Sequence, residues 1–281
     1  MPVFDSYMVV DWSANGTPKT GRDSIWIAHL RPGQPVVLDN PPTRAAAMTR
    51  IAATLSEEAD QGRRALAGFD FAFGYPQGLA RAMGPAADWR DIWAFLHDHL
   101  TDGPDNANNR FDLAARLNAL FPGEGPFWGN GLARDIPGLP RRKPQGWGAH
   151  LPANRRLADS LAPGAQEVWK LSGAGSVGGQ SLTGQAALEG LRRRIPVTVW
   201  PFESVDASRA PVLAEVFPSL IPLDATLHPV RDAAQVTGLA QALAAWDAAG
   251  RLAALLDMSR RMPESVRRFE AMILGVDALA S

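Results

Sequence analysis

Two aspartates each end a short apolar run, and together they have the chemistry of a metal-binding pair. Asp11 follows "YMVV" and Asp70 follows "ALAGF". A carboxylate at the end of a buried strand is costly to desolvate unless it caps the next turn, pairs with another group or binds a cation. Two like charges held close together usually have a divalent cation between them. We therefore expect Asp11 and Asp70 to bind a cation together.

Two further acids are candidates to complete this site. Glu215 lies within the apolar run "LAEVFPS", and Asp232 begins a helix. Glu203, at the end of the preceding apolar run, is the alternative to Glu215 as the third acid of the site. Asp232 has an alternative role as an ordinary acidic residue at a helix N-terminus. Hard oxygen ligands without His or Cys favour Mg²⁺ or Mn²⁺ over zinc. Such ions activate water in phosphodiester hydrolysis, so Asp11, Asp70, Glu215 and Asp232 are predicted as catalytic and metal-binding residues.

The elements that must position these acids are predicted at the N-terminus as three strands, a helix and a fourth strand. Apolar, β-branched runs bounded by Gly, Pro or Asn indicate the strands. Thr43 is a suitable N-cap for the helix and Gly62 a suitable stop. In this order the first and fourth strands are central neighbours, which brings Asp11 beside Asp70. The predicted ranges are 7–14, 24–30 and 34–40 for the first strands, 43–62 for the helix and 64–76 for the fourth strand.

The rest of the chain is predicted to complete one α/β domain over residues 1–281. Residues 80–165, rich in Pro, Gly and Trp, indicate an irregular insertion or cap. A helix is expected at 183–194, strands at 195–203 and 211–219, a helix at 230–256 in which Gly250 is a candidate break, and a helical tail at 265–276. The fold expected is a mixed sheet flanked by helices, with the core order β-β-β-α-β-α-β-α.

The stretch "VWKLSGAGSVGG" contains a glycine motif with two possible meanings. Gly173, Gly175 and Gly178 match G-x-G-x-x-G, which binds dinucleotides when it follows a strand and opens a helix. Glu203 lies at a suitable distance for the ribose contact, but the preceding "AQEVWKLS" is a poor central strand. The glycines equally permit a tight loop with positive φ. On this second interpretation the loop brings Lys170 and several backbone N–H groups to a phosphate, and Lys170 is predicted as a catalytic residue that stabilises the phosphate charge.

Further residues are candidates for contacts with a phosphate-containing substrate. Arg110 and Arg116 flank the start of a short helical segment, and a guanidinium suits bidentate phosphate contacts. A plain surface helix is the alternative for this segment. The predicted substrate-binding set is Ser13, Arg110, Arg116, Gly173, Gly175, Ser176 and Gly178.

Composition excludes several classes of protein. The 281 residues include 28 basic and 29 acidic side chains, so the net charge of −1 provides no overall attraction to nucleic acid or anionic lipid. Without cysteine there are no disulfides, thiolate metal sites or cysteine nucleophiles. No run is long enough to span a membrane and the first residues do not resemble a signal peptide, so a cytoplasmic protein is expected.

Five segments together resemble a family of predicted nucleases with a ribonuclease H-like fold. They are "VVDWS", "AGFDFAFGYP", "AEVFPS", "RDAAQVTGLAQALA" and "FEAMILG", similar to that family's motifs in order and spacing. The resemblance covers both ends of the chain and skips its middle. It implies a ribonuclease H-like core, nuclease-like hydrolysis, and acids at Asp11, Asp70, Glu215 and Asp232.

The function expected is therefore a Mg²⁺- or Mn²⁺-dependent phosphodiesterase or nuclease. Its substrate is DNA, RNA or a small phosphate ester. Two alternatives stay open: a non-catalytic nucleotide or sugar-phosphate binding protein on the same fold, and a dinucleotide-binding enzyme that uses the glycine motif.

Overall fold

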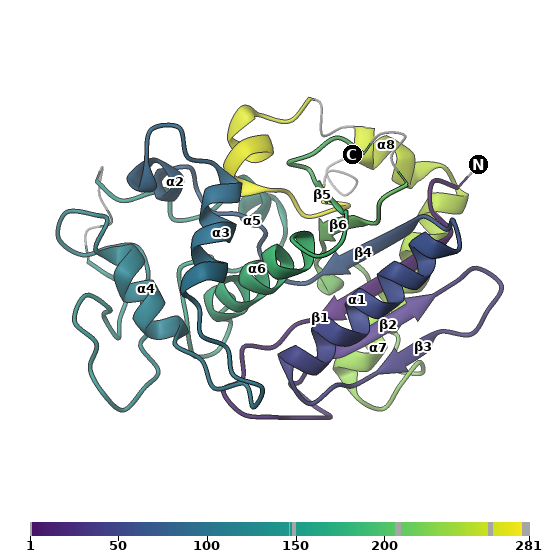
Figure 1. Cartoon of the computed structure of the whole chain (residues 1–281), viewed down its shortest axis with the longest axis horizontal. Coiled ribbons are helices and arrows are strands. Elements are labelled where there is room, and N and C mark those ends of the chain that lie inside the picture. Colours follow the sequence, from purple (N-terminus) through teal and green to yellow (C-terminus); the bar gives the residue numbers. More distant parts are fainter. Residues whose placement is uncertain (1, 146, 148–149, 206–208, 258–260, 277–281) are drawn as a thin grey trace.

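The computed structural model describes residues 2–145, 147, 150–205, 209–257 and 261–276 (Figure 1). Its centre is a mixed six-stranded sheet in the order β3-β2-β1-β4-β6-β5. Strands β1, β4, β6 and β5 run parallel to one another, and β2 is antiparallel to both β1 and β3. The strands are β1 (Ser6–Asp11), β2 (Trp26–Leu30), β3 (Val37–Asp39), β4 (Ala65–Phe69), β5 (Thr198–Trp200) and β6 (Val212–Glu215).

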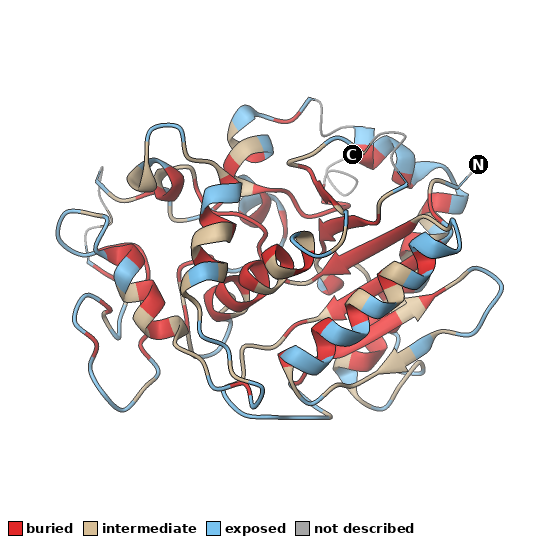
Figure 2. Ribbon diagram, in the orientation of Figure 1, coloured by how far each residue is buried: buried red, intermediate tan, exposed pale blue. Residues whose placement is uncertain are grey.

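Helices cover both faces of the sheet, which explains why its central strands are apolar throughout (Figures 1 and 2). Tyr7 and Val9 of β1 pack in the core that includes α7 (Arg231–Ala248), while Met8 and Val10 pack in the core that includes α1 (Arg44–Asp60) and α6 (Gly178–Arg192). Successive residues of a strand point to opposite faces, so one run of apolar residues supplies both cores.

The predicted helix at 43–62 is confirmed with its capping residue. Thr43 is the N-cap of α1 and its hydroxyl accepts a hydrogen bond from the N–H of Ala46. The helix ends at Asp60, and Gly62 follows with a φ of +69°. The predicted break near Gly250 is also present, because α7 ends at Ala248 and α8 (Arg251–Asp257) begins after it.

Residues 80–165 contain short helices and much irregular chain that pack beside the sheet domain (Figure 1). Helix α3 runs along α6, and both contribute to a third apolar core rich in aromatic side chains. The helices of this region are α2 (Gly78–Met83), α3 (Trp89–His99), α4 (Arg110–Asn118) and α5 (Leu157–Leu161).

Three sequence expectations about the later elements are wrong. Helix α6 begins at Gly178, five residues before the predicted start, because the close packing of Gly178 against the carbonyls of Val168 and Lys170 outweighs the low helix propensity of glycine. The two strands predicted at 195–203 and 211–219 are both present, as β5 and β6, so the condensed core order, which has one strand after this helix, is wrong. The tail is helical only as a short π-helix, Val266–Glu270; beyond it Ile273 forms a parallel bridge with Glu215.

The coarse expectation of an α/β protein with a mixed sheet flanked by helices is confirmed. A 3₁₀ turn, Pro218–Leu220, follows β6 and leads toward α7. In the part of the chain that the structure describes, no helix has the length and apolar character needed to cross a bilayer.

Candidate active site

Asp11 and Asp70 lie side by side at the carboxyl ends of the two central strands. The parallel register of β1 and β4 pairs Val10 with Phe69, so each aspartate is the next residue along its strand direction. The N–H of Asp70 donates to the carbonyl of Val10 at 3.2 Å. Asp70 Oδ1 in turn accepts a hydrogen bond of 2.7 Å from the N–H of Trp12. The predicted juxtaposition of these two acids is confirmed.

No described basic side chain compensates the negative charge of Asp11 and Asp70. Burial raises the pKa of Asp11 well above its ordinary value, and the charges of Asp70 and Asp232 raise it further. Burial also raises the pKa of Asp70, to about 6, although the hydrogen bonds from Trp12 and Asp11 oppose this rise. The two carboxyl groups thus lie close enough for the charge on one to influence the pKa of the other.

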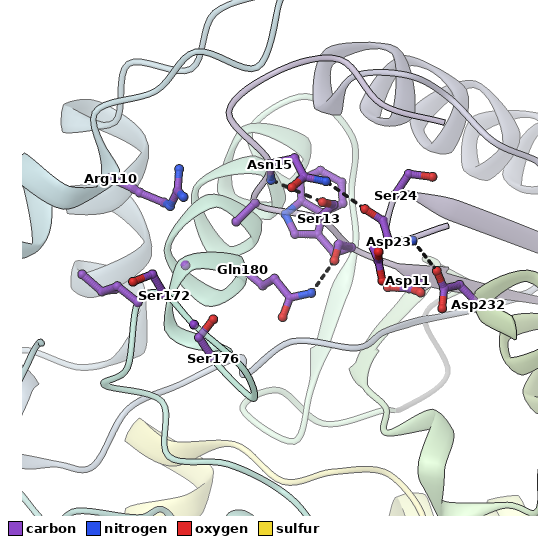
Figure 3. Close-up of a pocket in the computed structure, with 15 residues that line it drawn as sticks. Asp11, Ser13, Asn15, Asp23, Ser24, Arg110, Ser172, Ser176, Gln180 and Asp232 are labelled. Carbon is purple, nitrogen blue, oxygen red and sulfur yellow. Dashed lines mark hydrogen bonds between the residues drawn. The ribbon is translucent and has the colours of Figure 1, made fainter. Parts of the chain in front are cut away.

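The acidic pair lies beside an open cavity of about 420 Å³, here called the first cavity. Figure 3 shows Asp11, Asp23 and Asp232 on one side of it and Arg110 on the other, with Gln180 between them. Asp232 is in the first turn of α7, and its Oδ2 accepts from the N–H of Asp23 at 2.7 Å. Asp232 thus has both proposed features: it is an acidic residue at a helix N-terminus and it faces the site.

Arg110 is the basic group of the first cavity. It begins α4, its Nη1 donates to Asn108 Oδ1 at 2.9 Å, and its guanidinium lies over the ring of Phe111. Its buried Nε has no hydrogen-bond acceptor, and no described carboxylate forms an ion pair with it. Burial lowers the pKa of Arg110 to about 10, and the nearby charge of Arg44 contributes to this shift. A guanidinium with unused donors in a cavity is suited to an anionic ligand.

The glycine motif forms the wall of the first cavity beside Arg110. Gly173 and Gly175 have positive φ values of 88° and 69°, as expected for a tight loop. The loop leads directly into α6, whose first turn includes Gly179 and Gln180. Both of these residues line the cavity together with Ser172 and Ser176. The N-terminus of a helix carries unpaired N–H groups and a partial positive charge, so it adds to the basic side of the cavity.

The dinucleotide interpretation of this motif lacks its structural requirement. Residues 163–170, which precede the loop, form turns and a single isolated bridge rather than a strand of the sheet. Glu203 is also engaged elsewhere, since it accepts from the N–H of Val199 and forms an ion pair with Arg90. The motif therefore does not occupy a strand-loop-helix unit of the dinucleotide-binding type.

The loop between β1 and β2 is fixed by buried polar side chains from other parts of the chain. Arg44 donates to the carbonyls of Ser13 and Asn15 and forms a bidentate ion pair with Asp102. Asn106 accepts from the N–H of Arg44, and its amide donates to carbonyls at residues 17 and 42. These contacts tie the loop that follows Asp11 to α1 and to the chain around residues 102–106.

Glu215 does not act as the third acid of the cluster. Its side chain is buried and both carboxylate oxygens accept from Arg156 at 2.7 Å; Oε2 also accepts from the N–H of Phe73. Burial raises the pKa of Glu215, whereas Arg156 lowers it. Asp159 contacts the same guanidinium at 2.6 Å. The expected four-carboxylate site is wrong at this position because Glu215 already has its cation.

The other predicted residues fall into two groups. Ser13, Arg110, Gly173 and Ser176 line the first cavity, whereas four others do not. The Lys170 ammonium donates to the carbonyl of Ala174 and lies over the ring of Trp128, so it closes the glycine loop on itself. The exposed Arg116 lies over the ring of Phe95. The remaining two are Gly175, which faces the side chain of Gln166, and Gly178.

Several site residues were not anticipated from the sequence. Asp23, Asn15, Ser172 and Gln180 all line the first cavity. Gln180 is held by a hydrogen bond of 2.5 Å from its amide to the carbonyl of Trp12. Of these four residues, only Ser172 could have been expected from the sequence, because it adjoins the glycine motif. Asp23 has a positive φ of 53°, which sequence does not reveal for a non-glycine residue.

Within the described ranges, no three His, Cys, Asp or Glu side chains are grouped so as to hold a metal ion. The donors available to a cation are therefore the two carboxyl groups of Asp11 and Asp70. Mg²⁺ is commonly held by one or two carboxylates together with substrate phosphate oxygens and water, so this smaller donor set fits it. Comparisons of the chain with protein-family models, functionally characterised proteins and solved structures gave no match.

Proposed function

We propose that this protein hydrolyses a phosphate ester with the help of Mg²⁺ or Mn²⁺, on a ribonuclease H-like core. One observation carries the proposal: Asp11, which with its neighbour Asp70 has no described basic partner, lies on one side of the first cavity, and Arg110, which has no described ion-pair partner, lies on the other. A ligand that satisfies both sides carries positive and negative charge together, as the cation complex of a phosphate does.

On the acidic side, Asp11 and Asp70 would hold the cation. Their raised pKa values reflect burial together with like charges nearby, and a divalent cation removes that cost. No described Lys or Arg competes for these two carboxyl groups. When bound, the cation lowers the pKa of a water molecule and neutralises charge on the phosphoryl oxygens.

On the basic side, Arg110 and the first turn of α6 bind the non-bridging phosphate oxygens. Arg110 supplies charged donors and Ser176 adds a hydroxyl group at the same wall, whereas the hydroxyl of Ser172 donates to the carbonyl of Gly129. These contacts fix the phosphorus between the two sides of the cavity, which is the positioning that phosphoryl transfer requires.

In the reaction, water forms a new bond to phosphorus as the ester P–O bond breaks, and one water proton finally resides on the released alcohol. Asp232 is suited to accept that proton first. It faces the first cavity, and only its Oδ2 has a hydrogen-bond partner among the described residues. The leaving oxygen is then protonated, so hydrolysis consumes one water and leaves a phosphate and an alcohol.

The arrangement of the sheet supports the ribonuclease H-like interpretation. Strands β1 and β4 are central and parallel, β2 is antiparallel, and the two acids follow the carboxyl ends of the parallel pair. Asp232 comes from the start of a helix packed on the same sheet. These are the positions that the sequence resemblance implies for three of its four acids.

The direct test is hydrolysis of bis(4-nitrophenyl) phosphate, 4-nitrophenyl phosphate, single-stranded DNA and RNA, with Mn²⁺, with Mg²⁺ and with EDTA. We expect metal-dependent turnover of at least one ester that is lost in Asp11→Asn and kept in Asp60→Asn, a matched change at an exposed site. Turnover that persists in EDTA or in Asp11→Asn refutes the proposal. Phosphate binding with no turnover of any substrate also refutes it, and identifies a binding protein.

A further inference from the structure

A second cavity of about 190 Å³ adjoins the acidic pair. It shares Asp11 and Gln180 with the first cavity, and Asp70 lines it as well. Its other walls come from β6 and the turn after it, from the start of α7, and from the insertion. A ligand that extends through both cavities therefore passes directly beside the two carboxyl groups.

Among the described residues that line the second cavity, no basic side chain is available to a negatively charged group. Its arginine is Arg156, and all five N–H groups of that guanidinium are engaged. They donate to Asp159, to both oxygens of Glu215 and to the carbonyl of Glu270. The remaining charges on its walls are carboxylates. A second phosphate placed here finds no free basic side chain and lies against carboxylates whose partners are already engaged, so this cavity disfavours anions.

The second cavity is instead equipped for an uncharged ring with hydrogen-bonding atoms. Phe217 is half-buried on its wall, and Val216, Pro218 and Ile273 add apolar surface. The side chain of Gln235 makes no hydrogen bond to any described residue, so both its donor and its acceptor are available. A side-chain amide pairs with the edge of a nucleobase or a similar heterocycle, and an aromatic ring stacks on its face.

We infer that the substrate is a small phosphate ester whose alcohol carries an uncharged, planar, hydrogen-bonding ring, with the phosphate in the first cavity and the ring in the second. This inference rests on the proposed function and narrows it. The two volumes together lie within the range of roughly 300–1,000 Å³ that is typical of small-molecule sites. A continuing nucleic acid strand is disfavoured, since its next phosphate finds no free basic side chain in the second cavity.

The test compares the binding of inorganic phosphate, adenosine 5′-monophosphate and a 5′-phosphorylated dinucleotide by calorimetry in Mn²⁺. We expect the mononucleotide to bind at least about tenfold more tightly than inorganic phosphate, because stacking contributes on that order. Gln235→Leu is expected to weaken mononucleotide binding about threefold to tenfold and to leave inorganic phosphate unchanged. Gln241→Leu, the same change at an exposed position of α7, serves as the matched control.

Each other outcome has a distinct meaning. Equal affinity for inorganic phosphate and the mononucleotide overturns the inference and leaves the proposed function in place. Tighter binding of the dinucleotide than of the mononucleotide also overturns it and indicates a polymeric substrate. Failure of all three probes to bind in Mn²⁺ contradicts the proposed function itself.

Discussion

The uncompensated charge at Asp70 predicts that the cation-free protein loses stability as pH rises, and that Asp70→Asn removes this loss. The pKa of Asp70 rises from an ordinary 3.8 to about 6. Because the folded-state value is the higher one, the stabilisation due to the proton is complete below the unfolded pKa. It is lost as pH rises through the folded pKa.

The size of this effect follows from the two pKa values. About 1 kcal/mol of the stabilisation is lost by pH 4.5 and about 3 kcal/mol by pH 7.5, which leaves a difference of about 2 kcal/mol between these conditions. Water reaches the carboxyl groups through the cavities and screens their charges, so this figure is an upper limit. Titrating groups other than Asp11, whose pKa depends on Asp70, are common to the compared proteins and cancel in the difference.

The assay is urea unfolding in EDTA at pH 4.5 and pH 7.5 for the wild type, Asp70→Asn and the exposed control Asp60→Asn. On going from pH 4.5 to pH 7.5, we expect the free energy of unfolding of Asp70→Asn to increase by up to about 2 kcal/mol relative to that of the wild type. The free energy of unfolding of Asp60→Asn should change as the wild type does. Adding Mn²⁺ at pH 7.5 stabilises the wild type and the control Asp60→Asn but not Asp70→Asn, because metal binding adds to the stability of the folded state. Parallel pH dependence of the wild type and Asp70→Asn refutes the charge argument.

Three further predictions concern other contacts. Arg110→Gln weakens the binding of inorganic phosphate in Mn²⁺, measured by calorimetry, by about 1.5–3 kcal/mol, because a charged hydrogen bond is lost. Arg116→Gln, the same change at an exposed site, leaves this affinity unchanged. Arg156→Met lowers the free energy of unfolding by about 3–5 kcal/mol in urea at pH 7.5, since two buried carboxylates lose their partner. Gly184→Ala places a methyl group 2.4–2.5 Å from the ring of Phe71 and lowers stability by about 1–3 kcal/mol; an unchanged thermal midpoint contradicts this packing.

Local patterns predicted the acidic pair well and its surroundings poorly. Asp11 and Asp70 each end a buried apolar run, and strand order alone brought them together. The error at Glu215 had a different origin. Its partner Arg156 lies 59 residues away in the irregular insertion, where no periodicity indicates which side chain turns inward.

The same limit explains the glycine motif. A helix that starts with Gly178-Gly179 contradicts helix propensity, and only close backbone packing in three dimensions favours it. Lys170 was expected at a phosphate because it adjoins this motif, yet its ammonium binds a carbonyl four residues along the chain. Proximity in sequence indicated the right loop but not the direction of its side chains.

The position of β6 in the sheet has a consequence for synthesis of the chain. β6 pairs with β4 on one side and β5 on the other, although it is the last strand to be made. On the ribosome, β4 therefore keeps an open edge, and Arg156 lacks Glu215, until residues 212–215 emerge. Such an edge favours pairing with other chains. This protein thus depends on its C-terminal third to close the sheet, and nascent chains stalled before residue 212 are the form most exposed to aggregation.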